Sequence, residues 1–521
     1  MDPHLILLTV SFAILGSILG MVTGLVPGLH ANNVALMLAS LSPVIVSYLS
    51  GVEDALLMVC VAMIACSITH TFVNFIPTTF LGAPEGDTAL TLLPAHSLLL
   101  EGRGYQAVAL SAIGSLGAVL FGFLFVFPYR FIMAPPVNLY GILNEYMVYI
   151  LTAISVLLIL TERGAVPYKK GLVPKENGIK PLAIWNEGRD EEEKTVSLKL
   201  GSECKITGKA VKIYDFHTFE LEDQRGRRIF VKGTEMNPAV FKNIEVTVDG
   251  RAELMRFKWS RALALAAAVL IFLLSGLFGE VVSEISYTSP INMPSGGLFP
   301  ALTGLFGFAT LSHSLMLSPK IPTQRVEEPV FNRMESVKSV LIGSSTASIL
   351  GFLPGMSAAQ ATILSMLARR NKTPEQVIVT LCSVNTADAF FCIAALFTIG
   401  KARSGVTASV MNTMVMEEWS GFLPLQLASL LIGVIIASLI GYYATRWIGK
   451  RFAEVFTSMP YRPLLIGVLL LMSVLVFLFT GLLGLLTLAV GMGIGLIAPL
   501  LGVRRSHAMG VILLPVIVSL L

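Results

Sequence analysis

Two Pro-Gly steps inside long apolar runs are the features of this sequence that could bind a ligand. The first lies in the segment GMVTGLVPGLHANN (Gly20–Asn33) and the second in ASILGFLPGMSAAQ (Ala347–Gln360). Proline lacks a backbone donor and glycine tolerates unusual dihedral angles, so each step predicts a break in a helix. With an offset of 327 residues the segments match at three pairs of positions, which are Gly24 with Gly351, Pro27 with Pro354 and Gly28 with Gly355.

Each break would leave backbone N–H groups at the start of the following half-helix, which also carries the positive end of the helix dipole. Such an end binds an anion without any side-chain charge. Polar side chains that follow the breaks could add hydrogen bonds to this anion; they are His30, Asn32, Asn33, Ser357 and Gln360. Two alternatives stay open: these side chains only cap helices and pack between them, or the breaks are kinks in spanning helices that bind nothing.

Ionisable side chains inside or between apolar runs are further candidates, because charge in a membrane segment is costly unless it serves a function. Three carboxylates are candidates for coupling to an ion or a proton, namely Glu85, Asp87 and Asp388. Three cations could bind an anionic substrate or pair with those acids, namely Arg103, Lys401 and Arg403. His70 on an apolar face is more typical of a buried, hydrogen-bonded histidine than of a proton carrier. His30 directly follows the first break and is the better candidate of the two.

The order of these features recurs in the two halves of the chain. Each half runs from a Pro-Gly step to a Val-Asn pair and then to a cation flanked by glycine. The pairs are Val73-Asn74 and Val384-Asn385, and the cations lie in Gly102-Arg103-Gly104 and in Lys401–Gly405. We therefore count Asn74 and Asn385, with the glycines and prolines of the two breaks, among the candidate substrate-binding residues.

No constellation typical of an enzyme occurs in the sequence. There is no metal-spaced His/Cys cluster, no Walker loop and no GxSxG motif, and the five cysteines form no CxxC pair. We expect no catalytic residue, no cofactor and no bound metal. Without an ATP site, any active transport would run on a gradient of Na⁺ or H⁺.

Composition is typical of a polytopic membrane protein. Hydrophobic residues make up 54% and charged residues 13% of the chain, and the mean hydropathy is +0.76. No soluble domain of this length has such values. The first apolar run, Leu5–Val26, lacks the basic flank of a signal peptide, and similar runs recur to the end of the chain. The expected fold class is an all-α polytopic membrane protein.

The distribution of Lys and Arg predicts the orientation and an internal repeat. Residues 1–102 and 262–319 contain neither, which places the N-terminus and residues 280–297 outside, whereas basic residues flank the polar insert 161–257 and place it in the cytoplasm. The first Pro-Gly hairpin then enters from outside and the second from inside, and about five spans follow each. We expect two inverted-topology repeats in the plasma membrane, each with a re-entrant or broken-helix hairpin. The first comprises residues 1–160 and 258–320, and the second comprises residues 321–521.

The insert has a different pattern. From Lys205 onward, hydrophobic residues alternate as in strands, and several short strands over about 50 residues are typical of a small, OB-like barrel. Residues 200–256 carry ten Lys/Arg and nine Asp/Glu, so no basic groove for nucleic acid is expected. We interpret this β-rich region as a regulatory or assembly domain.

With these motifs in place, the sequence resembles TctA, the large membrane subunit of the tripartite tricarboxylate transporters. The Gly-x-x-Pro-Gly motif of that family is matched by Gly24, Pro27 and Gly28. Its later motifs are matched in order by Ser67-Ile68-Thr69, Asn74, Pro77, Pro94, Gly102-Arg103-Gly104, Pro354-Gly355 and Leu396–Gly400. The resemblance covers nearly the whole chain except the insert and suggests a divergent, archaeal branch. It implies a gradient-driven permease for di- or tricarboxylates that works with a small membrane subunit or a binding protein.

Two other functions stay open. Pro354-Gly355-Met356-Ser357 is similar to a motif of polyprenyl-phosphate transporters and undecaprenyl-pyrophosphate phosphatases, although Ala358 replaces the arginine that the phosphatases need. The chain would then translocate a phosphorylated polyprenyl lipid. Alternatively it is a membrane scaffold that transports nothing. The partners that fit these hypotheses are a small anion, a coupling ion, membrane lipid and a second copy of the chain, but no nucleic acid.

Overall fold

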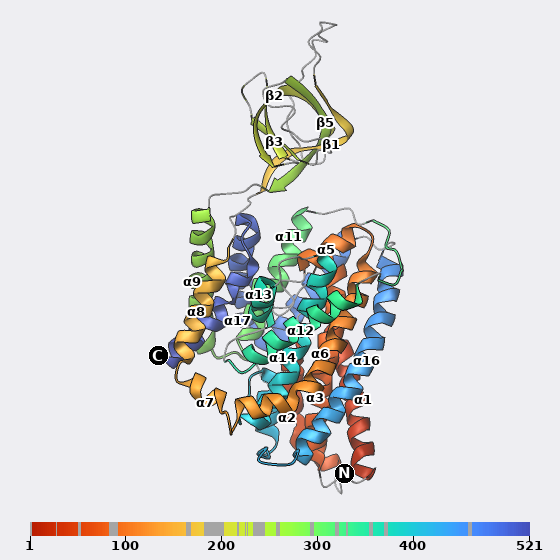
Figure 1. Cartoon of the computed structure of the whole chain (residues 1–521), viewed down its shortest axis with the longest axis vertical. Helices are drawn as coiled ribbons and strands as arrows, with labels where there is room; N and C mark the ends of the chain where they lie inside the picture. Colours follow the sequence, from red (N-terminus) through yellow and green to blue (C-terminus); the bar gives the residue numbers. More distant parts are fainter. Residues whose placement is uncertain are drawn as a thin grey trace. The chain divides into compact units, whose positions relative to one another are not determined.

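The computed structural model describes residues 3–27, 29–49, 54–82, 92–162, 168–181, 203–215, 218–223, 226, 228–232, 245–256, 261–291, 296–317, 322–329, 332–353, 358–368, 373–456 and 461–521. Contacts divide the chain into two compact units (Figure 1). The helical unit comprises Met1–Thr161, Ala268–Pro499 and Arg504–Leu521. The barrel unit comprises Glu162–Ala267 and Leu500–Val503.

The first part of the helical unit begins with an interrupted pair of helices. α1 (Pro3–Leu25) ends before the first Pro-Gly step, and α2 (Ala31–Tyr48) begins after it. The interruption agrees with the helix break predicted from this step. The helices that follow are α3 (Ala55–Val73), α4 (Phe75–Phe80), α5 (Leu92–Leu100), α6 (Gly104–Met133), α7 (Leu139–Asn144) and α8 (Met147–Leu160).

A similar succession occurs later in the chain. α12 (Arg333–Leu350) ends before the second Pro-Gly step, and α13 (Ala358–Ala368) begins after it. Then follow α14 (Pro374–Thr398), α15 (Gly405–Thr413) and α16 (Leu425–Phe456). α5 and α15 both have 9 residues, and the helices after them, α6 and α16, have 30 and 32. Two stretches of the chain thus share one order of elements, except that the short helix α4 of the first stretch has no counterpart in the second.

The remaining helices lie between and after these two stretches. Between them are α9 (Arg261–Glu284), α10 (Leu298–Leu302), the π-helical segment η2 (Thr303–Phe308) and α11 (Ala309–Leu317). After them are α17 (Tyr461–Leu501), the 3₁₀ segment η3 (Arg505–Met509) and α18 (Gly510–Leu520). Within the described residues, nine helices are long and apolar enough to cross a membrane. The chain is therefore a multi-pass helical membrane protein, as its composition predicted.

α3 and α14 form the centre of the helical unit. In the candidate span that begins with α3, 89% of the most apolar window is buried, and in α14 the value is 78%, against 28% for α1. Glycines let neighbouring helices approach these two closely. A Cβ at Gly16 or Gly20 of α1 would collide with the backbone of α3, and a Cβ at Gly114 of α6 would collide with the backbone of Val379 on α14. Figure 1 shows α1, α3, α6 and α16 packed side by side in this unit.

The barrel unit contains a closed five-stranded barrel in the order β1-β4-β3-β2-β5. Its strands are β1 (Tyr168–Pro181), β2 (Glu203–Asp215), β3 (Thr218–Asp223), β4 (Arg228–Lys232) and β5 (Glu245–Arg256). β1 pairs in parallel with β4, and the other pairs are antiparallel. The inward side chains are apolar, among them Leu172, Phe219, Val231 and Val248. The predicted strands after Lys205 are present, and β1, which the alternation did not indicate, completes the barrel.

Candidate functional site

The residues after the first break are held at the start of α2. His30 is the N-cap residue of α2, and its Nδ1 accepts a hydrogen bond of 3.2 Å from the backbone N–H of Asn32. The Oδ1 atom of Asn32 accepts a hydrogen bond of 3.1 Å from the backbone N–H of Val406. Gly405 packs against Asn32 so closely that a Cβ there would lie 2.8 Å from Cγ of Asn32. The first break therefore faces the start of α15.

Asn33 follows in the same turn of α2. Its backbone N–H donates to the carbonyl of His30 at 3.0 Å. Its side-chain Nδ2 is buried and has no hydrogen-bond partner in the described part of the chain. A buried donor without an acceptor is costly, by about 1–3 kcal/mol. An acceptor on a ligand would remove that cost.

The residues before the second break contact α14 and α7. Gly351 directly follows α12, and a Cβ at this position would lie 3.3 Å from Oδ1 of Asp388 on α14. The ring of Phe352 lies 6.3 Å from the ring of Tyr140 on α7, measured between centroids. Asp388 is thus beside the second break, where a coupling carboxylate is expected.

The cations Lys401 and Arg403 lie over Tyr140. Nη2 of Arg403 donates to the hydroxyl of Tyr140 at 2.9 Å, and its guanidinium lies 5.3 Å from the ring centroid. Nζ of Lys401 lies 5.7 Å from the same centroid. Nε of Arg403 is buried and, among the described residues, has no partner. The phenol of Tyr129 on α6, which is 1% exposed, interacts electrostatically with both Arg403 and Asp388.

The segment Lys401–Val406 therefore connects the surroundings of the two breaks. At one end Arg403 contacts Tyr140, which packs on Phe352, and at the other end Val406 donates to Asn32. Two buried donors without acceptors, Nε of Arg403 and Nδ2 of Asn33, lie in these surroundings. Donors that lack acceptors, next to a guanidinium, suit a carboxylate or a phosphate.

Several predicted site residues cannot be placed. Gly28, Glu85, Asp87, Pro354, Gly355 and Ser357, and the side chain of Gln360, lie outside the described residues. Gly24 lies at the end of α1, where a Cβ would lie 2.8 Å from Cβ of Val73, and Pro27 lies in the interruption after α1. The roles of these residues remain predictions.

Asn74 and Asn385 are buried on the two central helices. Asn74 caps the C-terminal end of α3, and Asn385 lies inside α14. α3 and α14 meet nearby, because the hydroxyls of Thr71 and Thr386 lie 3.1 Å apart. The structure thus brings the two halves together near these asparagines.

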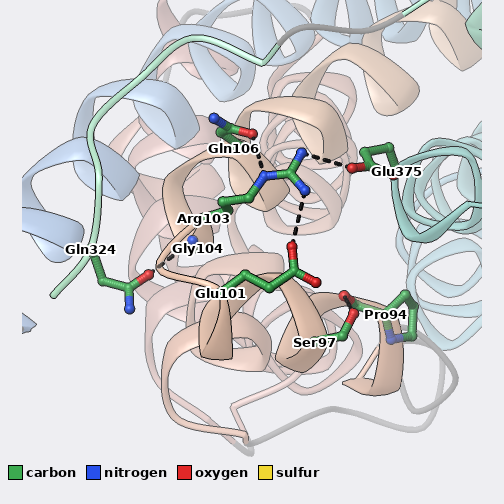
Figure 2. A network of polar contacts seen from close by, with 8 residues as sticks. All are labelled: Pro94, Ser97, Glu101, Arg103, Gly104, Gln106, Gln324 and Glu375. Carbon is green, nitrogen blue, oxygen red and sulfur yellow. Dashed lines mark hydrogen bonds and ion pairs between the residues drawn. The ribbon is translucent and has the colours of Figure 1, made fainter. Parts of the chain in front are cut away.

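Arg103 belongs to a different cluster (Figure 2). Its guanidinium forms ion pairs with Glu375 at 2.7 Å and with Glu101 at 3.1 Å, and Nε donates to Gln106 at 2.9 Å. Burial disfavours the charge on Arg103, but hydrogen bonds and charges from the two glutamates outweigh it and raise the pKa of the guanidinium above its ordinary value. The cluster joins the start of α6 to the first turn of α14.

This cluster lies far from Asp388 along α14. Thirteen residues separate Glu375 from Asp388, a rise of about 20 Å along the helix. Arg103 also precedes α6, whereas Arg403 precedes α15, so the two arginines occupy different places in the succession of helices. The described contacts therefore do not bring Arg103 to Arg403.

Gln324 completes the cluster around Arg103. Its Oε1 accepts from the backbone N–H of Gly104 at 2.9 Å, and its Nε2 donates to the carbonyls of Leu99 at 3.0 Å and Pro322 at 2.7 Å. Neither Gln324 nor Glu375 stood out in the sequence. The Thr373-Pro374 start of α14, a capping box with proline at the first position, is the signal that could have placed Glu375 in a first turn.

A pocket with a volume of about 440 Å³ lies at the end of α15 and is lined by Leu56, Gly400 and Met411–Met416. This size would suit a small ligand. The lining contains no charged side chain, and it approaches the cations only through Gly400. We therefore do not assign the pocket to an anionic substrate.

The spans and the interrupted helices define a polytopic α-helical membrane protein. A family model described as "Tripartite tricarboxylate transporter TctA family" matches residues 10–173 and 257–510. The chain therefore belongs to the TctA family of transporter proteins. An uncharacterized protein of the archaeon Methanocaldococcus jannaschii is 24% identical over 405 residues, which cover 78% of this chain and 72% of that protein. No solved structure matches the chain.

These findings confirm the family resemblance and fit its archaeal branch. The family match stops at residue 173 and resumes at residue 257, so it omits most of the barrel. The barrel is thus an addition to the helical framework that the family model describes.

Proposed function

We propose that this protein is the membrane permease of a gradient-driven transporter for small organic anions of the di- or tricarboxylate class. The observation that supports this proposal most directly is the position of Lys401–Val406 between the surroundings of the two breaks. Nε of Arg403 and Nδ2 of Asn33 would donate to a carboxylate there, and the start of α2 would add the positive end of its dipole.

The two similar successions of helices support an inverted-repeat mechanism. In our proposal α1–α6 and α12–α16 are related by opposite orientation in the membrane, and the site lies where they meet. Rocking of one repeat against the other would expose the site to each side in turn. The insert 161–257 would be cytoplasmic and the N-terminus external, as the Lys and Arg distribution predicts.

We propose that the barrel is a circularly permuted OB barrel, in which the strand that comes last in an OB fold comes first along the chain. β2, β3 and β4 form a meander, and β5 and β1 close the barrel with β1 parallel to β4. An OB barrel has these pairings when β1 is counted as its final strand. The barrel would act in regulation or assembly. The word "tripartite" in the family description also supports a small membrane subunit and a binding protein as partners.

A thermal-stability screen of the purified protein tests the substrate class. Citrate and succinate should raise the unfolding midpoint by several degrees at millimolar concentration, because ligands that bind only the native state stabilise it. Polyprenyl phosphate in the same detergent should not. Stabilisation by polyprenyl phosphate without any effect of carboxylates would replace our proposal with lipid translocation. Stabilisation by neither class would favour a scaffold.

A further inference from the structure

The phenol of Tyr129 is a buried hydrogen-bond donor near the candidate site. Tyr129 lies close to the end of α6 with 1% of its surface exposed. Its hydroxyl has no hydrogen-bond partner among the described residues. A buried tyrosine usually has such a partner, because a polar group that loses water and gains no hydrogen bond is unfavourable. The position of this hydroxyl therefore suggests an acceptor that comes from outside the protein.

A closed series of contacts places the phenol beside the second break. On one side the ring of Tyr129 packs on Phe391 with 5.0 Å between centroids, and a Cβ at Gly351 would lie 3.8 Å from Cβ of Phe391. On the other side Arg403 donates to Tyr140, whose ring packs on the residue that follows Gly351. The charge of Arg403 also acts on the phenol itself. Tyr129 and Arg403 therefore border one region next to the second break.

The charged neighbours of the phenol do not satisfy its hydroxyl. The guanidinium of Arg403 can only donate, so it cannot accept the phenolic hydrogen. The carboxylate of Asp388 acts on Tyr129 through its charge, but it does not accept that hydrogen either. The phenol and Nε of Arg403 are thus two buried donors without acceptors in the same surroundings. An anion that the guanidinium attracts would supply acceptors for both.

The later succession of helices indicates what helix packing requires at this position. Two glycines of α6 and two of α16 make corresponding close contacts with the central helices; these contacts are Gly114 with Val379, Gly122 with Phe390, Gly433 with Val61 and Gly441 with Phe72. The glycines of α6 and α16 correspond with an offset of 319 positions. With this offset Tyr129 corresponds to Ile448, which has no polar group. Packing at this place in the framework therefore does not depend on a hydroxyl.

We propose that the hydroxyl of Tyr129 donates a hydrogen bond to a carboxylate of the substrate. Arg403 attracts this carboxylate and donates through Nε, and the phenol donates to a lone pair that Nε leaves available. The anion adds a negative charge near Asp388, and the coupling cation of the proposed function would offset it. This inference rests on the proposed function and adds a residue that determines the affinity for carboxylates.

Calorimetric titration of the full-length protein with citrate tests this donor. Tyr129→Phe should weaken citrate binding by about tenfold or more, because a hydrogen bond to a charged acceptor is lost. Tyr105→Phe is the matched control, since Tyr105 is also buried on α6 but its hydroxyl donates to Glu328 at 3.1 Å. This control should bind citrate like the wild type. Equal affinities of Tyr129→Phe and the wild type would overturn the inference and leave the proposed function intact, whereas a wild type that binds no citrate would count against both.

Thermal unfolding separates a binding role of the hydroxyl from a structural one. Without citrate, Tyr129→Phe should unfold at the temperature of the wild type or above it, because the substitution removes a polar group without a partner. With citrate, the unfolding midpoint of the variant should rise less than that of the wild type. Tyr105→Phe should lower the midpoint in both conditions, because it breaks a hydrogen bond within the protein. A lower midpoint of Tyr129→Phe without citrate would assign the hydroxyl a structural partner and overturn the inference.

Spectra of the wild type with ¹³C at Cζ of tyrosine test the hydrogen bond directly. The signal of Tyr129 should shift when citrate is added, because its hydroxyl then becomes a donor. This signal is identified by its absence in Tyr129→Phe or in Tyr129→Trp. A Tyr129 signal that citrate leaves unchanged would overturn the inference. A wild-type spectrum in which citrate shifts no tyrosine signal would do the same even if neither variant folds.

Discussion

Arg403 is held at the candidate site by an aromatic neighbour rather than by a carboxylate. Tyr140 accepts a hydrogen bond from Nη2 and presents its ring to the guanidinium, which leaves Nε for a ligand. Arg103 differs, because two glutamates neutralise it. The two arginines thus have different partners, a phenol for Arg403 and two carboxylates for Arg103.

Replacing Arg403 tests its proposed role. We expect Arg403→Gln to weaken citrate binding by about tenfold to thirtyfold, because one charged hydrogen bond contributes about 1.5–2 kcal/mol. Calorimetric titration measures this loss. Arg451→Gln is the matched control, since Arg451 is an exposed arginine that pairs with Glu454 on α16. Equal affinities for Arg403→Gln and the wild type would remove Arg403 from the site.

The ion pair of Arg103 and Glu375 should contribute to stability and not to binding. Both side chains are partly exposed, so we expect a coupling free energy of only about 1 kcal/mol in a double-mutant cycle with Arg103→Ala and Glu375→Ala. Unfolding in mixed micelles measures the free energy of each variant. If Arg103→Ala leaves stability unchanged but abolishes citrate binding, Arg103 is a substrate ligand after all.

The sequence indicated the breaks but not the neighbours that complete the site. Pro27 and Pro354 predict interruptions by local chemistry alone, and helices do end before both. The contact between Arg403 and Tyr140 joins residues 263 positions apart, so no local pattern could reveal it. Arg103 and Arg403 follow the breaks in the same order of features, but Arg103 precedes α6 and Arg403 precedes α15, because the order of residues along the chain does not specify which helix follows.

Among the elements, α1 depends on glycine for its place against α3. Gly16 and Gly20 lie one helical turn apart on the same face, and both face the backbone of α3. The same face carries Thr23, which holds His70. The packing of α1 therefore places Thr23 next to His70.

A larger residue in this contact should separate α1 from α3. We expect Gly20→Leu to lower the free energy of unfolding by about 2 kcal/mol, as overpacking usually does. Gly467→Leu on α17 is the control, because a Cβ there meets nothing within 4 Å. Thermal unfolding compares the two variants. An equal effect of both substitutions would show that the close contact is unimportant.

Alternation in the sequence predicted the β-rich insert but not its first strand. β1 contains Gly171, Pro174 and Gly178, which weaken the pattern of a strand. It is kept in place by pairing with β5 along most of its length, and such distant pairing leaves no local signal. Turn chemistry and periodicity therefore revealed β2 to β5, and tertiary pairing determines β1.

For the whole chain, the barrel is inserted in a way that the helical unit should tolerate. Tyr168 pairs with Arg256, so the two ends of the barrel lie on adjacent strands, about 5 Å apart. Replacing Tyr168–Arg256 with a four-residue Gly/Ser linker should leave a monodisperse protein in detergent that citrate still stabilises. Residues 168–256 expressed alone should fold as a β protein. Aggregation of the deletion variant would show that the helical unit needs the barrel.

Cysteine labelling in intact cells tests the orientation. In a background without the five native cysteines, we expect Ser286→Cys to react with an impermeant maleimide and Lys175→Cys to react only after lysis. Both positions are exposed, so burial would not explain a difference in labelling between them. The reverse pattern would invert the proposed topology, and with it the side from which each break is entered.

Uptake of labelled citrate into proteoliposomes tests transport by this chain most directly. With an inward-directed gradient of H⁺ or Na⁺ we expect citrate to accumulate, with loss of accumulation in Arg403→Gln and full activity in Arg451→Gln. The barrel-deletion variant should retain uptake if the barrel only regulates. Citrate that binds in detergent but never accumulates, with or without a gradient of H⁺ or Na⁺, would contradict the assignment of this chain as a carboxylate permease.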